Sequence, residues 1–226
     1  TAQSKVRQGV TRELTGNCGM SFCAPLYGDA EILFREALSE YTSSFDVTWD
    51  DFAGYLDALQ NAGSTVNVAT QVGHHTIRAC VVGLEDKPPS REGLDRMKGL
   101  IAESLDAGAM GFSTGLYYAP GNYARPEEVI HLAVATAERG KLYSTHMRDE
   151  GAANVGLFPS INESIEVARR TGVRLEISHV KCQGPSVYGQ ANQLLDHFDR
   201  AKTEGIDIAG DQYPYTAGST SLTGAM

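Results

Sequence analysis

Residues 141–179 read KLYSTHMRDEGAANVGLFPSINESIEVARRTGVRLEISH, and this stretch decides the fold class. Its two ends, Lys141 to His146 and Val173 to His179, are short apolar runs of strand length. Between them, the capping box SINE beginning at Ser160 predicts the start of a helix, because its serine and glutamate side chains satisfy the first free backbone N–H groups. Gly172 predicts the end of that helix. A strand, a helix and a second strand in succession indicate a βαβ unit with parallel strands.

The same alternation extends in both directions from this unit. Further amphipathic helices are expected after Ser90 and Pro126 and around Leu194. Further strands are expected at residues 10–15, 65–70, 109–114 and 206–211. The ends of consecutive strands are evenly spaced, with 33 residues from Ser113 to His146, 33 from His146 to His179 and 32 from His179 to Asp211.

This spacing predicts a (β/α)8 TIM barrel, because such a barrel of about 250 residues uses about 31 for each unit. An open doubly wound sheet has similar spacing, but no G-x-G-x-x-G or G-x-x-x-x-G-K-[ST] loop follows a predicted strand. About six strands are predicted where a closed barrel needs eight. We therefore expect residues 1–226 to be a segment of one barrel domain, with about two strands absent from this chain.

The composition excludes several function classes. The chain is 42% hydrophobic and 21% charged, which is typical of a soluble globular protein. It has no apolar run of about 20 residues and no signal peptide, so we expect no membrane partner and a cytoplasmic location. The net charge of −9, with dispersed basic residues, argues against nucleic acid. Four scattered cysteines without a C-x-x-C pair are expected to be free thiols. The sequence does not indicate an oligomeric state.

Four chemically versatile residues stand at the predicted carboxyl ends of strands, namely Cys18, His146, His179 and Asp211. In parallel barrels these ends face a common cavity. Thiolate and imidazole are good zinc ligands, and a catalytic zinc uses about three protein ligands. Cys18, His146 and His179 could form that set. The alternative is structural, with hydrogen-bonded histidines and a small buried cysteine, and the spacing alone does not decide between the two.

Five motifs in order resemble those of the N-acyl-D-amino-acid deacylases (D-aminoacylases) of the amidohydrolase superfamily. They are GNCG at residues 16–19, GFSTGLYY at 111–118, STHMRDE at 144–150, ISHVK at 177–181 and DQYPY at 211–215, followed by AGS at 217–219. The resemblance covers almost the whole chain and implies that residues 1–226 are the central segment of one metal-dependent hydrolase barrel domain, with flanking strands and any small β-domain absent. It implies a zinc-dependent barrel enzyme that splits the amide of an N-acyl-D-amino acid into a carboxylate and the free D-amino acid.

The resemblance also implies roles for individual residues. Cys18 would be the family's cysteine ligand, in the bridging place that a modified lysine holds in other amidohydrolases, and His146 and His179 would complete the tight zinc site. Lys181 would pair with the substrate α-carboxylate. On general grounds too, a cation beside a metal cleft suits an anionic substrate.

Three further positions are predicted around the substrate. Tyr118 and Tyr213 are similar to tyrosines that line the family's substrate pocket, and the alternative is simple packing with the hydroxyl at the rim. Arg148 is predicted among the substrate-binding residues. Together with Glu150, it could instead support the metal ligands from behind or form an ordinary loop ion pair.

Several candidate residues are not assigned a catalytic role. His74 and His75 are adjacent, and the family's first metal motif, H-x-H, does not occur in the sequence, so both are expected to be structural or to line the pocket wall. The family's catalytic aspartate is expected beyond Met226, and Asp211 is expected to accept backbone N–H groups at a strand end. The 226-residue chain alone is therefore predicted to hold one zinc and to have little deacylase activity.

Two alternatives to this function remain open. One is another amidohydrolase chemistry, such as hydantoin, cyclic-amide or dipeptide hydrolysis, although GNCG argues against it because those relatives usually use a lysine or carboxylate bridge. The other is a non-catalytic α/β binding module. The sequence indicates neither the preferred D-amino-acid side chain nor whether one or two metals bind.

Overall fold

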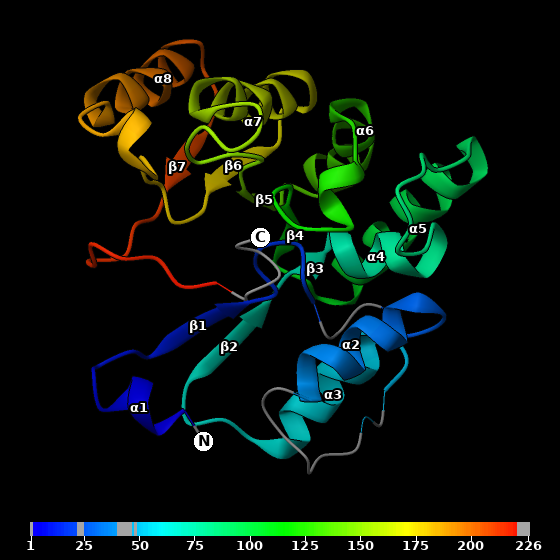
Figure 1. Ribbon diagram of the computed structural model, residues 1–226. Helices are drawn as coiled ribbons and strands as arrows, with labels where there is room; N and C mark the ends of the chain where they lie inside the picture. Colours follow the sequence, from blue (N-terminus) through cyan, green and yellow to red (C-terminus); the bar gives the residue numbers. More distant parts are fainter. Residues whose placement is uncertain (1, 22–24, 40–46, 48, 221–226) are drawn as a thin grey trace.

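The computed structural model describes residues 2–21, 25–39, 47 and 49–220 of the chain. In these residues every strand pairs in parallel, in one sheet of two strands and one of five (Figure 1). The strands are β1 (Arg12–Thr15), β2 (Asn67–Thr70), β3 (Val72–Gly73), β4 (Gly111–Gly115), β5 (Leu142–His146), β6 (Arg174–Ile177) and β7 (Ile208–Gly210). All six predicted strands are therefore present.

The two sheets are continuous through hydrogen bonds at Gln71, the single residue between β2 and β3. The Gln71 N–H donates to the carbonyl oxygen of Thr15 at 2.9 Å, and the Met110 N–H donates to that of Thr70 at 2.9 Å. The strand order thus follows the chain from β1 through the β2–β3 pair to β7. Parallel strands in sequential order, joined by helical crossovers, are the arrangement of a barrel wall.

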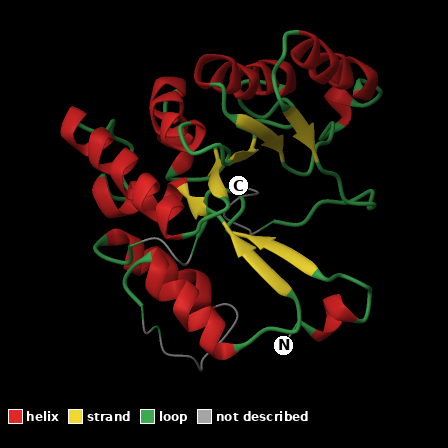
Figure 2. Cartoon of the chain, turned by 180° about the vertical axis from the view of Figure 1, so that it is seen from behind, coloured by secondary structure: helices red, strands yellow, loops and turns green. Residues whose placement is uncertain are grey.

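Helices cover the outer side of this wall, as Figures 1 and 2 show. Those between β3 and β7 are α4 (His74–Val81), α5 (Arg91–Ala107), α6 (Pro126–Ala137), α7 (Leu157–Thr171) and α8 (Ala191–Thr203). Before β2 lie α1 (Gln3–Val6), α2 (Asp29–Ser39) and α3 (Phe52–Ala62), and short 3-10 turns occupy Gly121–Tyr123 and Pro185–Val187. Ser90 caps α5, because its hydroxyl accepts from the Gly93 N–H at 3.0 Å.

The two faces of the central strands differ in chemistry. On one face Phe112, Tyr143, Leu175 and Ile208 stand in register and belong to the hydrophobic core shared with the helices. The opposite face carries small or polar residues, with Ser113 beside Ser144 and Glu176 following. Side chains alternate between faces along a strand, so the apolar core fixes which residues face the barrel interior.

The predicted capping box at Ser160 is wrong, because α7 begins a turn earlier, after Gly156. The Ser160 hydroxyl lies inside the helix and accepts from the Asp149 N–H at 2.9 Å. The Asp149 carboxylate accepts from the N–H groups of Gly151, Asn154 and Gly156 and orders the loop that leads into the helix. Tertiary hydrogen bonds have therefore replaced the local cap that the sequence pattern indicated.

No helix within the described ranges combines the length and the apolar character needed to cross a lipid bilayer.

Candidate metal site

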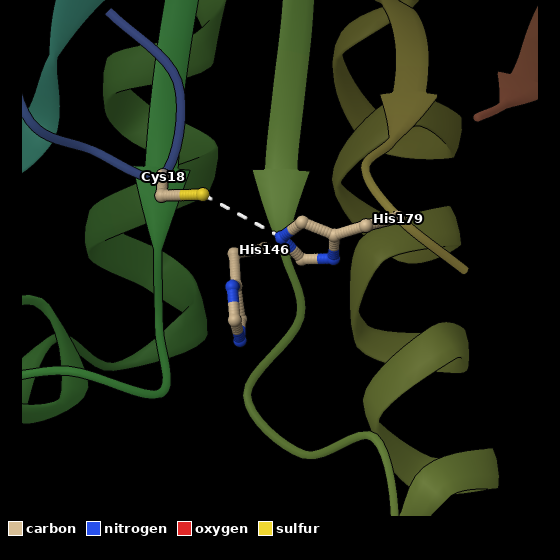
Figure 3. A group of neighbouring side chains, drawn as sticks. All are labelled: Cys18, His146 and His179. Atoms are coloured by element: carbon tan, nitrogen blue, oxygen red, sulfur yellow. Dashed lines mark hydrogen bonds between the residues drawn. The ribbon is translucent and has the colours of Figure 1, made fainter. Parts of the chain in front are cut away.

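Cys18, His146 and His179 meet at the carboxyl ends of the strands (Figure 3). One ligand atom from each lies within 4.8 Å of the others. The Cys18 Sγ is 3.5 Å from the His179 Nε2, and the two imidazole rings cross at 76° with centroids 4.4 Å apart. Cys18 belongs to the loop after β1, His146 ends β5, and His179 follows β6. The parallel fold thus brings together three residues that are far apart in sequence.

His146 is buried at the end of β5 and has a free nitrogen. Its side chain is 8% exposed, and its Nδ1 has no hydrogen-bond partner among the described residues. Burial lowers the pKa of His146 to about 4, and the positive charge on His179 and Lys181 adds to this against the opposing charge of Glu150. The ring is therefore neutral near pH 7 and can offer a lone pair to a metal ion.

His179 is held in an unusual backbone conformation by the neighbouring strand. Its φ is 42°, in the left-handed region that side chains other than glycine seldom adopt. Its N–H donates to the Asp211 Oδ1 at 2.7 Å. Asp211 therefore accepts a backbone N–H at a strand end, as expected from the sequence, and it fixes the turn that presents the His179 ring.

Glu150 connects the cluster to a cation. Its Oε1 accepts from the His179 Nδ1 at 3.0 Å and from the Lys181 Nζ at 2.6 Å, and its Oε2 is 3.9 Å from the His146 Nε2. Burial alone would raise the pKa of Glu150, but the hydrogen bonds from His179 and Lys181 and the charge of Lys181 lower it. The carboxylate is thus ionised, and its bond to the His179 Nδ1 leaves Nε2 directed at Cys18.

The proton on His179 competes with any metal ion. Burial would lower the pKa of His179, but the hydrogen bonds to Cys18 and Glu150 outweigh this effect and raise it to about 9. A metal ion that binds the Nε2 must displace a proton, so binding is linked to proton release.

The donor set fits zinc. A thiolate with two imidazoles is a ligand combination of catalytic zinc sites, where three protein ligands leave one position open. The unpartnered His146 Nδ1 and the Glu150 carboxylate behind His179 agree with this chemistry, because the first lacks another partner and the second orients a ligand ring.

Lys181 and Tyr213 lie beside the cluster. The Lys181 Nζ contacts the His179 carbonyl oxygen at 2.8 Å as well as Glu150, and it stands 5.4 Å from the centre of the Tyr213 ring. The Lys181 side chain remains 21% exposed. A cation is therefore available at the rim of the candidate site.

Tyr118 packs directly against the cluster. Its ring meets that of His146 edge to face with centroids 4.8 Å apart, and its hydroxyl pairs with the Thr220 hydroxyl at 2.9 Å. Burial raises the pKa of Tyr118. The phenol is thus neutral at pH 7, and Tyr118 forms part of the wall beside His146.

Arg148, which was predicted among the substrate-binding residues, bonds to the protein scaffold in the structure. Its guanidinium forms two bonds to Glu163, each 2.8 Å long, and donates to the carbonyl oxygens of Asn122 and Ala124 at 3.0 and 2.8 Å. All its nitrogens are occupied within the scaffold, and the residue is 8% exposed. Arg148 therefore ties α7 to the loop after β4 instead of facing a substrate.

His74 and His75 are structural, as expected from the sequence. The His74 Nε2 pairs with the Glu128 Oε1 at 2.8 Å, and the fully buried Arg78 approaches the same oxygen at 3.2 Å. The His75 Nε2 donates to the Gly115 carbonyl oxygen at 2.9 Å. Burial, helped by the charge of His74, lowers the pKa of His75 to about 3.

Comparison with known proteins gives a consistent set of relatives, although no family model matches the chain. An N-acyl-D-glutamate deacylase from Alcaligenes xylosoxydans xylosoxydans is 38% identical over 219 residues, which cover 96% of this chain and 43% of that protein. The crystal structure of the Bordetella bronchiseptica N-acyl-D-glutamate deacylase, complexed with zinc and a phosphonate inhibitor, is 35% identical with a TM-score of 0.81, over 93% of this chain and 43% of that one.

A D-aminoacylase crystal structure described as defining a novel subset of amidohydrolases is 34% identical, with a TM-score of 0.84. The match covers 95% of this chain and 44% of that one. This agreement confirms the predicted fold class, an α/β barrel of the amidohydrolase type. The chain spans less than half the length of each of these relatives.

Proposed function

Since the chain belongs to the N-acyl-D-amino-acid deacylases of the amidohydrolase superfamily, we propose that it supplies the tight zinc site of an enzyme that hydrolyses N-acyl-D-amino acids. The products are a carboxylate and the free D-amino acid. The observation that carries this proposal is the convergence of Cys18, His146 and His179 within 4.8 Å. When bound, zinc would supply Lewis-acid chemistry, polarising the acyl carbonyl and lowering the pKa of water from 15.7 to about 7.

Lys181 is proposed to bind the substrate α-carboxylate. Its partly exposed ammonium lies beside the metal ligands, where an N-acyl-amino acid would present a carboxylate near its scissile amide. The Lys181 Nζ donates to the Glu150 Oε1 at 2.6 Å, so a residue of the protein itself orients this ammonium beside the metal ligands. Tyr118 and Tyr213 are proposed to line the same pocket, since Tyr118 packs on His146 and Tyr213 stands beside Lys181.

The carboxylate that moves the proton is not assigned to this chain. Amide hydrolysis needs a group that takes a proton from water and returns it to the leaving amine. Glu150 is bound to His179 and Lys181, and Asp211 holds the His179 backbone. We therefore propose that residues 1–226 act as the central segment of one hydrolase barrel domain and have little deacylase activity alone. The 43% share of the relatives' length supports this proposal.

Metal analysis combined with substrate hydrolysis tests the proposed function. The 226-residue protein should contain one zinc, Cys18→Ser should lose it, and Cys80→Ser should keep it, because the Cys80 Sγ contacts the Pro25 carbonyl oxygen away from the cluster. The product of the full reading frame should hydrolyse N-acetyl-D-glutamate or N-acetyl-D-methionine but not the L enantiomers. Zinc retained in Cys18→Ser, or turnover only of hydantoins or dipeptides, contradicts the proposal.

We also propose that the protein works in the cytoplasm on this small molecule, without a nucleic-acid or membrane partner. The free thiols of Cys18, Cys80 and Cys182 and the net charge of −9 support this, whereas Cys23 lies outside the described residues. Cell fractionation followed by immunodetection tests it, and recovery in the membrane pellet would contradict it.

A further inference from the structure

Cys18, the cysteine of the candidate metal site, lies in a turn where its backbone has a conformation that is unfavourable for a residue other than glycine. Cys18 has a φ of 55°, in the left-handed region where a Cβ atom is crowded. The glycines on either side, Gly16 and Gly19, also have positive φ values, both 78°. A non-glycine residue remains in such a conformation only where surrounding contacts impose it. The contacts that hold this turn therefore determine where the Sγ points.

Ser113 forms hydrogen bonds to the turn on both sides of Cys18, and we call this pair of hydrogen bonds the Ser113 clamp. It stands in the middle of β4, is fully buried and belongs to the polar interior face of the strands. Its hydroxyl donates to the Gly16 carbonyl oxygen and accepts from the Gly19 N–H at 3.1 Å. One hydroxyl thus uses both its donor and its acceptor capacity on the two residues that bracket the cysteine.

The strand is also shaped to receive the turn. Gly115 lies two residues after Ser113 and on the same face, and a Cβ atom there would overlap the carbonyl of Cys18. Two other contacts each hold one side of the turn. The His75 N–H donates to the Gly19 carbonyl oxygen at 2.8 Å, and the Gln71 Nε2 donates to the Asn17 Oδ1 at 2.5 Å. These contacts press the turn onto β4, and Ser113 links its two ends.

From this geometry we infer that Ser113 is a positioning residue of the metal site, whose hydroxyl directs the Cys18 Sγ toward His146 and His179. Ser113 is 94 residues from Gly19 and 97 residues from Gly16 along the chain, so these two hydrogen bonds form only in the folded protein. The inference rests on the proposed metal site and adds to it a residue that touches neither metal nor substrate. Ser113→Ala would remove both hydrogen bonds without changing any of the three ligand residues.

Cobalt substitution and zinc competition test the inference. In the cobalt-loaded protein, a thiolate-to-cobalt charge-transfer band reports the bond to Cys18, and competition with a chelator measures zinc affinity. We expect Ser113→Ala to weaken the band and lower zinc affinity about tenfold or more, as outer partners of metal ligands commonly do. Ser113→Thr, which retains the hydroxyl, should restore most of both.

Ser104→Ala is the matched control. Ser104 is also buried, and its hydroxyl bonds to the Leu100 carbonyl oxygen within α5, so its loss affects stability but not the metal cluster. Wild-type band and affinity in Ser113→Ala would overturn the inference, and so would equal losses in Ser104→Ala or no rescue by Ser113→Thr.

Hydrogen exchange of the wild-type protein gives a test that needs no variant. The Gly19 amide hydrogen should exchange slowly because it is hydrogen-bonded to the Ser113 hydroxyl oxygen. If the Gly19 amide exchanged as fast as an amide without a hydrogen bond, the proposed role of Ser113 would be contradicted. This result can be obtained even if Ser113→Ala does not fold. Absence of the thiolate-to-cobalt band in the wild-type protein would instead contradict the proposed metal site, and with it this inference. Failure of the metal site and failure of the Ser113 hydrogen bonds therefore give different results.

Discussion

Glu150 connects the proposed metal site to Lys181, the residue proposed to bind the substrate carboxylate. One of its oxygens accepts hydrogen bonds from both His179 and Lys181. Glu150→Gln should lower zinc affinity about 10- to 100-fold, because the neutral amide orients the His179 ring less firmly. Zinc competition with a chelator measures this. Glu103→Gln is a control on an exposed pair with Arg96 and should not change the affinity. An unchanged affinity in Glu150→Gln would show that the carboxylate does not support the site.

Lys181 is the residue that should distinguish a charged substrate from a neutral one. In the full-length enzyme, Lys181→Ala should reduce kcat/KM for N-acetyl-D-amino acids about 10- to 100-fold, the value of a lost hydrogen bond between charged groups. The same change should have little effect on the corresponding carboxamide, which carries no carboxylate. Steady-state kinetics on both substrates measure the difference. Equal losses on both would assign Lys181 to the support of His179 and not to substrate binding.

At the scale of one element, α4 joins the site to the core through two buried histidines. His75 has a folded pKa of about 3 against 6.5 when unfolded, so the neutral form is needed in the folded state. Its contribution to stability is present above pH 6.5 and is lost as the pH falls toward 3. At pH 5 the loss is about 2 kcal/mol, at 1.36 kcal/mol for each pH unit.

Denaturant unfolding at pH 7.5 and pH 5 checks this prediction. His75→Gln keeps a donor for the Gly115 carbonyl oxygen but does not titrate, so its stability should fall less than that of the wild type between the two pH values. Parallel losses in both proteins would contradict the assignment of acid sensitivity to His75.

Another contact of α4 is the pairing of His74 and Arg78 with Glu128 of α6. Arg78 is fully buried, so Glu128→Gln leaves a cation without its charged partner. We expect the free energy of unfolding to fall by about 3–5 kcal/mol. Denaturant unfolding measures this, with Glu127→Gln as a control because Glu127 is exposed in the same helical turn. A loss no larger than that of Glu127→Gln would show that the pairing does not stabilise the fold.

For the whole molecule, regular features were predictable and tertiary exceptions were not. Alternating apolar runs revealed all six strand positions, because burial on one face imposes a regular pattern along each strand. The capping box failed because Asp149 takes over the entry to α7 and Glu163 binds Arg148. For Arg148 the sequence left substrate binding, support of the metal ligands and a loop ion pair open, and the structure shows an ion pair with Glu163, because a motif position does not reveal which way a guanidinium turns.

The candidate site shows the same division between local pattern and tertiary contact. Strand-end positions indicated Cys18, His146 and His179 as possible ligands, and their convergence agrees with that prediction. The role of Ser113 was not visible in the sequence, although it lies inside GFSTG. Its hydroxyl acts on residues that are distant along the chain, and a motif carries no information about such partners.

The separation of the three ligands along the chain has a consequence for folding. Cys18 and His179 are 161 residues apart, so closing the metal site encloses most of the polypeptide in one loop. A loop of that length closes at a large entropic cost, and no local segment could assemble the three ligands before the strands between them are in place. We therefore expect zinc to bind the proposed site only after the strands between the ligands have assembled, so that the ion would stabilise the completed sheet and would not nucleate its folding.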